Sequence, residues 1–326
     1  MNAVDHNNVV IFDDRGIPSI MCRFVRPKDT EEVPAVFKIG DKVADAIYIS
    51  KYPNIVIDGR AYSMPMADPT VNITFDEAVQ ACRCKGLGWH LMTAVEYEYL
   101  LNQSREKGTM PHGNTDWGKD YYHNEEQGKV SNLGRTYTGT GPVTWNHDHT
   151  PYGVSDLNGN VWEWLAGLRI KDGVIEFIPG NKAASPYCDL SKDSTEWQQA
   201  ETSKGPVRAN VECGEITITD AVAADDYEPN YDGVRIEELE VKLSEIPQVL
   251  KDLGIIPDKR AEEEGKTYVY FDATEGEYLP FRGSAFNNAS SSGPSALNLY
   301  SPRSDSSDFV GFRSAFYEVN GKLITE

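Results

Sequence analysis

Residues 108–167 are dense in Gly, Asn, Asp, Trp and Tyr, and they show no sustained helical or strand periodicity. An irregular stretch of this length is uncommon inside a compact domain, and it normally needs its own reason for order, such as a bound ion or a functional surface. The rest of the chain must supply the regular elements around it. Of 326 residues, 40% are hydrophobic and 10% aromatic, which is enough apolar material for one large domain or two small ones.

Two helices are predicted just before this stretch. Each begins with a capping box, in which a threonine side chain and a glutamate three residues later satisfy the first free amides. Apolar residues then recur at helical spacing, and a glycine can close the first helix. The two capping boxes are Thr74 with Glu77, ahead of residues 75–84, and Thr93 with Glu96, ahead of residues 95–102.

The N-terminal part of the chain is predicted to be β structure. β-forming runs at residues 9–12, 20–25 and 46–50 are separated by Gly and Pro. We interpret residues 1–44 as a β arm that could serve oligomerisation or attachment, followed by one domain over residues 45–326.

The acidic residues are concentrated in one segment. The chain carries 31 Lys and Arg against 51 Asp and Glu, a net charge of −20. Residues 215–266 hold 15 acidic and 6 basic residues, a balance of −9. We interpret them as an acidic insertion that decorates the domain with a solvated face, with one short helix within residues 246–253. So negative a protein is not expected to bind nucleic acid or anionic lipid.

The cysteine and hydropathy patterns favour a reduced protein outside the membrane. The five cysteines are odd in number and widely spread, so we expect core thiols rather than a disulfide framework. No stretch is long and apolar enough to span a bilayer, and the first residues lack the pattern of a secretory signal. We therefore expect no membrane insertion. His147-Asp148-His149 is expected to be a solvated turn rather than a metal site.

The densest motif covers residues 152–164 and reads Tyr-Gly-Val-Ser-Asp-Leu-Asn-Gly-Asn-Val-Trp-Glu-Trp. It resembles the formylglycine-generating enzyme and sulfatase-modifying-factor family, which has an elaborated C-type lectin fold. The resemblance extends to Gly-Trp-His-Leu-Met at 88–92, Phe-Arg-Gly-Ser at 281–284 and Gly-Phe-Arg-Ser-Ala at 311–315. It implies an α+β, loop-rich domain with small antiparallel sheets and two helices.

The same motif suggests a cation site. A hard cation such as Ca²⁺ takes about six to eight oxygen ligands, and one tight turn can offer carboxylates and main-chain carbonyls together. The resemblance implies a structural calcium site at Asp156, Gly159, Val161 and Glu163. The alternative is a turn held by its own hydrogen bonds and core tryptophans, with no ion. A second family calcium site is not expected, because Arg135 stands where an acidic ligand would be needed.

The resemblance to these oxidases does not extend to their catalytic residues. Formylglycine-generating enzymes use cysteine thiols near the C-terminus to hold copper and oxidise a substrate cysteine, whereas this chain has no cysteine after Cys213. Ser314 follows Gly-Phe-Arg at the matching position. We therefore expect no enzyme activity and no catalytic cofactor. A metal-dependent oxidase of the formylglycine-generating type is the disfavoured alternative.

The last part of the chain carries a second resemblance. Residues 284–309 include 9 Ser, 3 Asn and 2 Asp between the Phe-Arg-Gly and Gly-Phe-Arg runs. Residues 281–316 resemble the variable region of proteins diversified by retroelements, many of them phage-encoded, in which a fixed lectin scaffold carries interchangeable positions. Arg282 and Arg313 are expected to be buried partners of carboxylates. The resemblance implies these variable, ligand-binding positions: Ala285, Phe286, Asn287, Asn288, Ser290, Ser292, Asn298, Tyr300, Asp305, Ser307, Asp308 and Phe309.

These observations predict a non-catalytic protein whose C-terminal surface, diversified by retroelement mutagenesis, binds a protein or glycan on a target cell. Short polar and aromatic side chains on a rigid base suit such recognition. The protein would act on a phage tail, as a receptor-binding protein for host attachment, or at a cell surface, and could be a homotrimer. A calcium-dependent carbohydrate-binding lectin is a further alternative.

Overall fold

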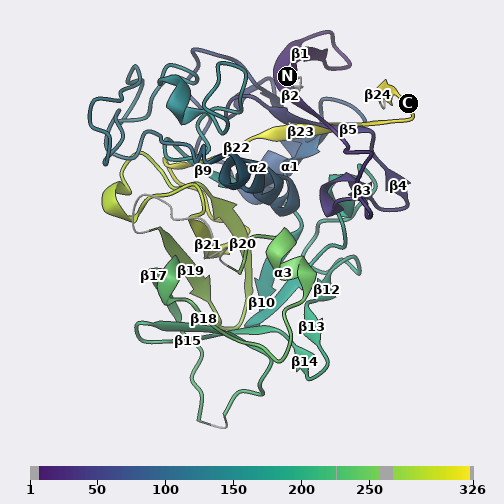
Figure 1. Ribbon diagram of the computed structural model, residues 1–326, viewed down its shortest axis with the longest axis vertical. Coiled ribbons are helices and arrows are strands. Elements are labelled where there is room, and N and C mark those ends of the chain that lie inside the picture. The colour runs from purple at the N-terminus through teal and green to yellow at the C-terminus, as the bar shows by residue number, and fades with distance from the viewer. Residues whose placement is uncertain (1–6, 225, 257–266, 324–326) are drawn as a thin grey trace.

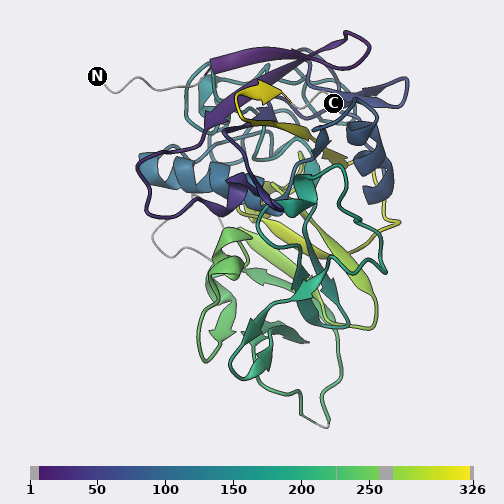
Figure 2. The same ribbon diagram turned by 90° about the vertical axis from the view of Figure 1, so that its right-hand side faces the viewer.

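The computed structural model describes residues 7–224, 226–256 and 267–323. Within these ranges two β-sheets lie toward opposite ends of the molecule, with the two longer helices between them (Figure 1). The view turned by 90° shows the same arrangement (Figure 2). None of the helices in the described ranges combines the length and hydrophobicity that a membrane span requires.

The smaller sheet joins the beginning and the end of the chain. In the described part it has six strands in the order β1-β2-β5-β23-β24, with β8 beside β23. Because β2 pairs with β5, the predicted N-terminal arm extends the sheet that begins the domain. Its role in oligomerisation stays a prediction. The strands are β1 (Asn7–Phe12), β2 (Pro18–Val25), β5 (Ala46–Ser50), β8 (His90–Leu91), β23 (Ser314–Val319) and β24 (Lys322–Leu323).

The larger sheet has twelve strands among the described residues and is mostly antiparallel. Three of its pairs, β16 with β18, β19 with β21 and β22 with β9, are parallel. The strands are β9 (Trp162–Trp164), β10 (Leu168–Lys171), β11 (Val174–Phe177), β12 (Gln198–Gln199), β15 (Arg208–Glu212), β16 (Glu215–Thr219), β17 (Tyr231–Arg235), β18 (Glu240–Lys242), β19 (Tyr268–Asp272), β20 (Glu277–Arg282), β21 (Leu297–Pro302) and β22 (Val310–Phe312). Three two-stranded ribbons complete this list: β3 (Lys38–Ile39) with β4 (Lys42–Val43), β6 (Ile55–Ile57) with β7 (Arg60–Tyr62), and β13 (Glu201–Thr202) with β14 (Gly205–Pro206).

The helices form where the sequence predicts them. Helices α1 (Phe75–Arg83) and α2 (Ala94–Lys107) both begin with the predicted capping box. Helix α2 runs further than expected and ends at Gly108, whose φ of 67° is the left-handed conformation that closes a helix. The short helix α3 (Gln248–Asp252) lies within the acidic segment, as predicted.

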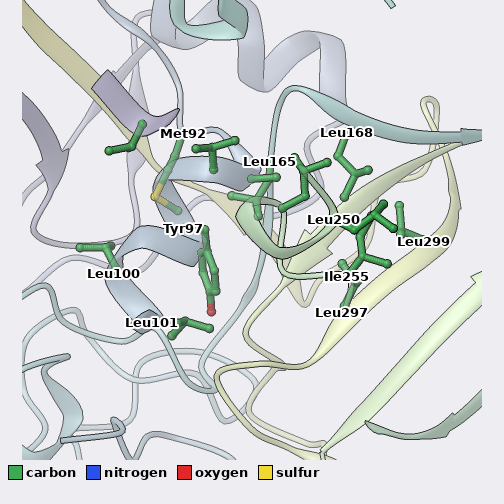
Figure 3. Packing of buried hydrophobic residues seen from close by; sticks show 14 of the residues in the cluster. Met92, Tyr97, Leu100, Leu101, Leu165, Leu168, Leu250, Ile255, Leu297 and Leu299 are labelled. Atoms are coloured by element: carbon green, nitrogen blue, oxygen red, sulfur yellow. The ribbon is translucent and has the colours of Figure 1, made fainter. Parts of the chain in front are cut away.

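The main hydrophobic core lies between α2 and the larger sheet (Figure 3). Tyr97 and Leu101 of α2 belong to the same buried cluster as Leu297 of β21. Leu250 and Ile255, on and just after α3, are buried in this cluster too. The expectation that the acidic segment only decorates the domain is therefore wrong for this part, because its described apolar residues contribute to the core.

Candidate ligand-binding site

The predicted variable positions lie on one continuous segment that includes an interior strand of the larger sheet. The segment forms a loop after β20, strand β21, and a second loop that leads into β22. The irregular stretch 108–167 packs beside the first loop (Figure 1), where the main-chain N–H of Trp117 donates to the carbonyl of Phe286 at 2.8 Å. Exposure differs among the positions: Asn287, Ser290 and Tyr300 are exposed; Asn288, Asp305, Ser307, Asp308 and Phe309 are half-buried; Ala285, Phe286, Ser292 and Asn298 are buried.

Three of the four buried positions contribute to packing. Ala285 and Phe286 belong to a hydrophobic cluster, and the ring of Phe286 meets that of Trp117 edge to face at 5.0 Å. The hydroxyl of Ser292 donates to the carbonyl of Ala289 at 2.6 Å within the loop. Ala285 and Phe286 face the interior, whereas Ser292 lines a separate hollow of about 220 Å³. A role for these three positions in ligand contact stays a prediction.

Five of the predicted positions line one pocket of about 210 Å³. They are Asn287, Asn288, Asn298, Tyr300 and Phe309, and the remaining wall consists of Trp162, Tyr270 and Phe281. All lining residues are aromatic or asparagine, and none is ionisable apart from the two tyrosines. We call this cavity the aromatic pocket.

Strand order brings the walls of the aromatic pocket together. Asn298 of β21 stands between Tyr270 of β19 and Phe281 of β20 in the sheet register. Tyr270 meets Tyr300 edge to face at 5.8 Å, and Phe281 meets Trp162 at 5.3 Å. Burial and the neighbouring phenols of Tyr300 and Tyr268 raise the pKa of Tyr270 to about 12, so this side chain is neutral at physiological pH.

The sequence did not identify Trp162, Tyr270 and Phe281 as pocket residues. The sequence predicts Trp162 as a core residue of the 152–164 motif. It indicates Phe281 only as part of the Phe-Arg-Gly run. The one available signal was the alternation of apolar residues along their strands. Alternation predicts that a strand has a buried face, but it does not predict which strands lie side by side on that face.

Arginines anchor both ends of the variable segment. Arg282 donates to Glu98 on α2 at 2.7 Å, and Arg313 donates through Nε to Glu163 on β9 at 2.6 Å. All four side chains are buried. The prediction that these two arginines are buried partners of carboxylates is therefore confirmed.

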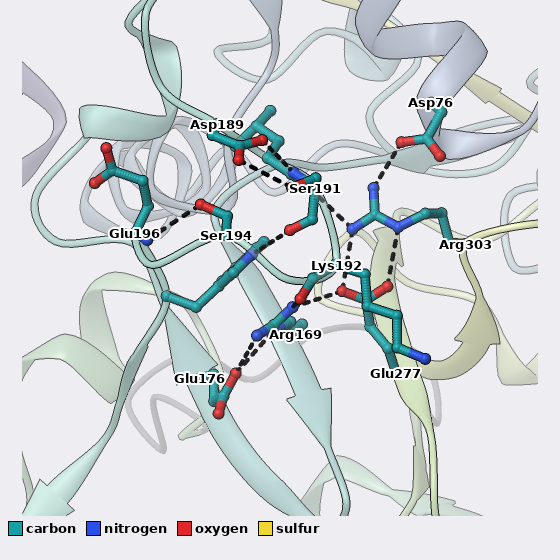
Figure 4. Close-up of polar contacts among 12 residues, drawn as sticks. Asp76, Arg169, Glu176, Asp189, Ser191, Lys192, Ser194, Glu196, Glu277 and Arg303 are labelled. Carbon is teal, nitrogen blue, oxygen red and sulfur yellow. Dashed lines mark hydrogen bonds and ion pairs between the residues drawn. The ribbon is translucent and has the colours of Figure 1, made fainter.

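A third arginine, missed by the sequence reasoning, fixes the turn after β21. Arg303 donates to both carboxylate oxygens of Glu277 at 2.9 and 3.0 Å and to Asp76 at 2.6 Å (Figure 4). Arg169 binds the same glutamate at 2.7 Å. Burial tends to raise the pKa of Glu277, but Arg303 and Arg169 more than reverse this and hold the pKa below its usual value. A hollow of about 540 Å³ lies beside this network, but among the predicted variable positions none lines it.

Arg135 links Asp68 to the second loop of the predicted variable segment. Its guanidinium donates to both carboxylate oxygens of Asp68 at 3.1 Å and to the carbonyl of Asp308 at 2.8 Å. The residue that argues against a second calcium site therefore holds the second variable loop directly.

Both acidic side chains of the predicted calcium turn have protein partners in this arrangement. Both carboxylate oxygens of Glu163 bind the guanidinium of Arg313, which already balances the negative charge of Glu163. Asp156 accepts from the main-chain N–H of Gly139 at 3.2 Å, and burial raises its pKa to about 6. In the described ranges no group of three or more His, Cys, Asp or Glu could hold a metal. Calcium at Asp156, Gly159, Val161 and Glu163 stays a prediction, for titration to decide.

The thiols and histidines give no support for oxidase chemistry. Burial raises the pKa of Cys22 to about 12 and that of Cys188 to about 11, which opposes thiolate formation. Ser314, which follows the Gly-Phe-Arg run, is buried and hydrogen bonded to Ser50 at 2.9 Å. The expectation of a solvated turn at His147 is wrong, because this residue is only 1% exposed and accepts from the N–H of Val154.

Part of the chain is similar in sequence to a known protein family. Residues 51–208 match the family model described as the sulfatase-modifying factor enzyme 1-like domain. The formylglycine-generating enzyme of Mus musculus is 36% identical over 105 residues, which is 30% of this chain and 27% of that enzyme. The matched segment thus spans about a quarter of the relative's length. These matches confirm the predicted resemblance, and with the small sheets and few helices they confirm an α+β C-type lectin-like fold.

Two groups of solved structures share a distant overall likeness. The Major Tropism Determinant I1 variant is 11% identical with a TM-score of 0.35, covering 97% of this chain and 56% of that one. Treponema denticola variable protein 1 is also 11% identical with a TM-score of 0.35, covering 95% of this chain and 98% of that one. Similarity at this level does not establish a shared function.

Proposed function

We propose that this chain is a non-catalytic binding protein and that the aromatic pocket is the centre of its ligand site. The observation that carries the proposal is the convergence of Asn287, Asn288, Asn298, Tyr300 and Phe309 on one cavity. These positions come from two loops and a strand. The sequence resemblance that implies them contains no information about cavities. Concave, largely apolar sites with a few convergent polar groups are typical ligand sites.

The sheet residues and the predicted variable positions of the site contribute different groups to binding. Trp162, Tyr270 and Phe281 belong to sheet strands and supply rigid apolar area. The asparagines and Tyr300 supply adaptable polar contacts and one exposed aromatic side chain, as antibody binding loops do with Tyr, Ser and Asn. We infer that retroelement mutagenesis diversifies these positions and that the ligand is a protein or glycan on a target cell. A phage tail or a cell surface is the corresponding location, and the 1–44 arm is the candidate site of trimerisation.

An oxidase of the formylglycine-generating type is the weaker candidate. It would need low-pKa thiols near residue 314, but the chain has no cysteine beyond Cys213. Incubation of the protein with copper and a cysteine-containing sulfatase peptide should therefore give no aldehyde by mass spectrometry. Formation of the aldehyde would refute the proposal that the protein is non-catalytic.

Two experiments test the proposed function. Sequencing of the DNA downstream of the gene should find a near-copy of the 281–315 coding segment that differs mainly at adenines, with a reverse transcriptase gene nearby. Labelled protein should bind strains from a panel of bacterial cells, and Tyr300→Ala should reduce this binding at least tenfold. Tyr187→Ala is the matched control, because Tyr187 is 79% exposed and does not line the aromatic pocket. Equal losses in both variants, or no loss in either, would contradict a ligand site at the aromatic pocket.

A further inference from the structure

We propose that the aromatic pocket of this variant binds one uncharged N-acetylated sugar residue, whose acetamido carbonyl accepts a hydrogen bond from Asn298. This inference rests on the proposed function and names the ligand chemistry of the same site. It follows from three properties of the pocket: its unpaired donors, its lack of charge and its size.

The first property is a set of amide donors that lack partners. The carboxamide oxygen of Asn298 accepts the main-chain N–H of Tyr300 at 3.0 Å, which turns the NH₂ group away from that contact. Asn298 is only 2% exposed, and within residues 7–224, 226–256 and 267–323 its NH₂ group donates to no side chain or carbonyl. Asn288 repeats the pattern, because its oxygen accepts the N–H of Ala285 at 2.6 Å. Neither NH₂ group is among the fully buried polar atoms that lack a partner, so both remain accessible to a ligand that brings acceptor oxygens.

The second property is the absence of charge. No Asp, Glu, Lys, Arg or His lines the aromatic pocket. Asp305 and Asp308 lie on the adjoining loop, and the protein carries a net charge of −20, so an anionic ligand would be repelled. An aromatic box can also hold a quaternary ammonium group. Here, however, the polar groups of the lining are carboxamides and phenols, and no lining carboxylate is available to pair with a cation.

The third property is size. At about 210 Å³ the cavity is smaller than the roughly 300–1,000 Å³ of pockets that enclose drug-sized ligands. It therefore accommodates one ring rather than an extended peptide. An N-acetylated hexose matches all three properties: its carbonyl oxygen accepts from the asparagines, and its methyl group and C–H face pack on Tyr270, Tyr300 and Phe281. The end of a surface glycan would present such a residue.

Saturation-transfer NMR with small probes tests this ligand class on the full-length protein. We expect methyl glycosides of N-acetylglucosamine or N-acetylgalactosamine to bind at least tenfold more tightly than those of glucose and galactose. N-acetyl-alanine methylamide represents a peptide source of the same amide group, and choline represents a cation. Neither should bind measurably. Stronger binding of either compound, or equal binding of the acetylated and plain sugars, would overturn the inference.

A change of donor to acceptor tests the role of Asn298. Asn298→Asp keeps the shape and the acceptor for the Tyr300 N–H but replaces the NH₂ group with oxygen, so sugar affinity should fall at least tenfold. Asn288→Asp makes the same exchange at a half-buried position and serves if the first variant fails to fold. Asn210→Asp on β15 is the matched control and should leave affinity unchanged. Retained affinity in both pocket variants would overturn the inference.

The failure of this inference can be separated from failure of the proposed function. If no N-acetylated sugar binds but Tyr300→Ala still abolishes binding to cells, the ligand class is wrong and the pocket remains the binding site. If Tyr300→Ala also leaves cell binding intact, the proposed function fails with it.

Discussion

Replacement of Glu163 by glutamine should destabilise the protein strongly, and it should do so whether or not calcium is present. The exposed fraction of the side chain is 2% for Glu163 and 0% for its partner Arg313. Glutamine keeps the shape but removes the negative charge, and its NH₂ group faces one guanidinium N–H instead of accepting from it. Removal of one partner from a buried ion pair typically costs about 3–5 kcal/mol. That is a large part of the roughly 5–15 kcal/mol that stabilises a typical domain.

Urea unfolding followed by tryptophan fluorescence measures this loss. Glu201→Gln is the matched control, because Glu201 is exposed on β13, and it should change the free energy of unfolding by less than about 0.5 kcal/mol. Each protein is measured in calcium and in chelator. A loss below about 1 kcal/mol for Glu163→Gln would refute the role of the ion pair. If chelator alone destabilised the unmodified protein as much as the substitution does, Glu163 would be a calcium ligand and the present reading of the turn would be wrong.

Three further substitutions test the buried polar groups and the tight turn. Burial raises the pKa of Asp156 from 3.8 to about 6, so the stability that its bound proton contributes is lost as pH rises through this range. Relative to D156N, the unmodified protein should lose about 2.5 kcal/mol between pH 4 and pH 7 in urea titrations. Burial lowers the pKa of Lys85 from 10.5 to about 7, so the unmodified protein should gain stability relative to K85M, on the order of 4 kcal/mol, as pH rises from 7 to 10; a flat difference would contradict the shift. Gly159→Ala would place Cβ 2.1 Å from the carbonyl oxygen of Asn114, whereas Gly214 has a similar φ and open space. Thermal melts should show Gly159→Ala to be roughly 1–3 kcal/mol more costly than Gly214→Ala, and equal costs would rule out the clash.

Local signals in the sequence predicted local structure well. The capping boxes at Thr74 and Thr93 gave the starts of α1 and α2, because capping depends only on residues within one turn. The sequence also indicated that Arg282 and Arg313 would be buried with carboxylates. It could not say which ones, because Glu98 and Glu163 lie 184 and 150 positions away along the chain.

The pocket itself was beyond the reach of sequence reasoning. Residues 296–300 alternate apolar with other side chains, a pattern typical of a strand with two faces. The structure has Leu297 and Leu299 in the core with Asn298 and Tyr300 on the pocket side. What alternation does not contain is the strand order. Strand β21 pairs in parallel with β19 and antiparallel with β20, so the neighbours of Asn298 follow from a crossover rather than from adjacent sequence.

The way in which the scaffold holds the variable segment explains how its side chains could change without loss of the fold. Several contacts from outside the segment end on main-chain carbonyls of the predicted variable positions, and a carbonyl is the same whatever side chain its residue carries. The donors are Trp117 N–H to Phe286, Asn72 N–H to Ser307, Arg135 to Asp308 and Trp162 N–H to Phe309, each at 2.8 Å, and the Tyr122 hydroxyl to Ser290 at 3.2 Å. Substitution at these positions therefore leaves the acceptor carbonyls unchanged, and one of the positions, Phe309, also lines the aromatic pocket. Anchoring through main-chain carbonyls tolerates the exchange of side chains, and this tolerance is a property that a diversified binding surface needs.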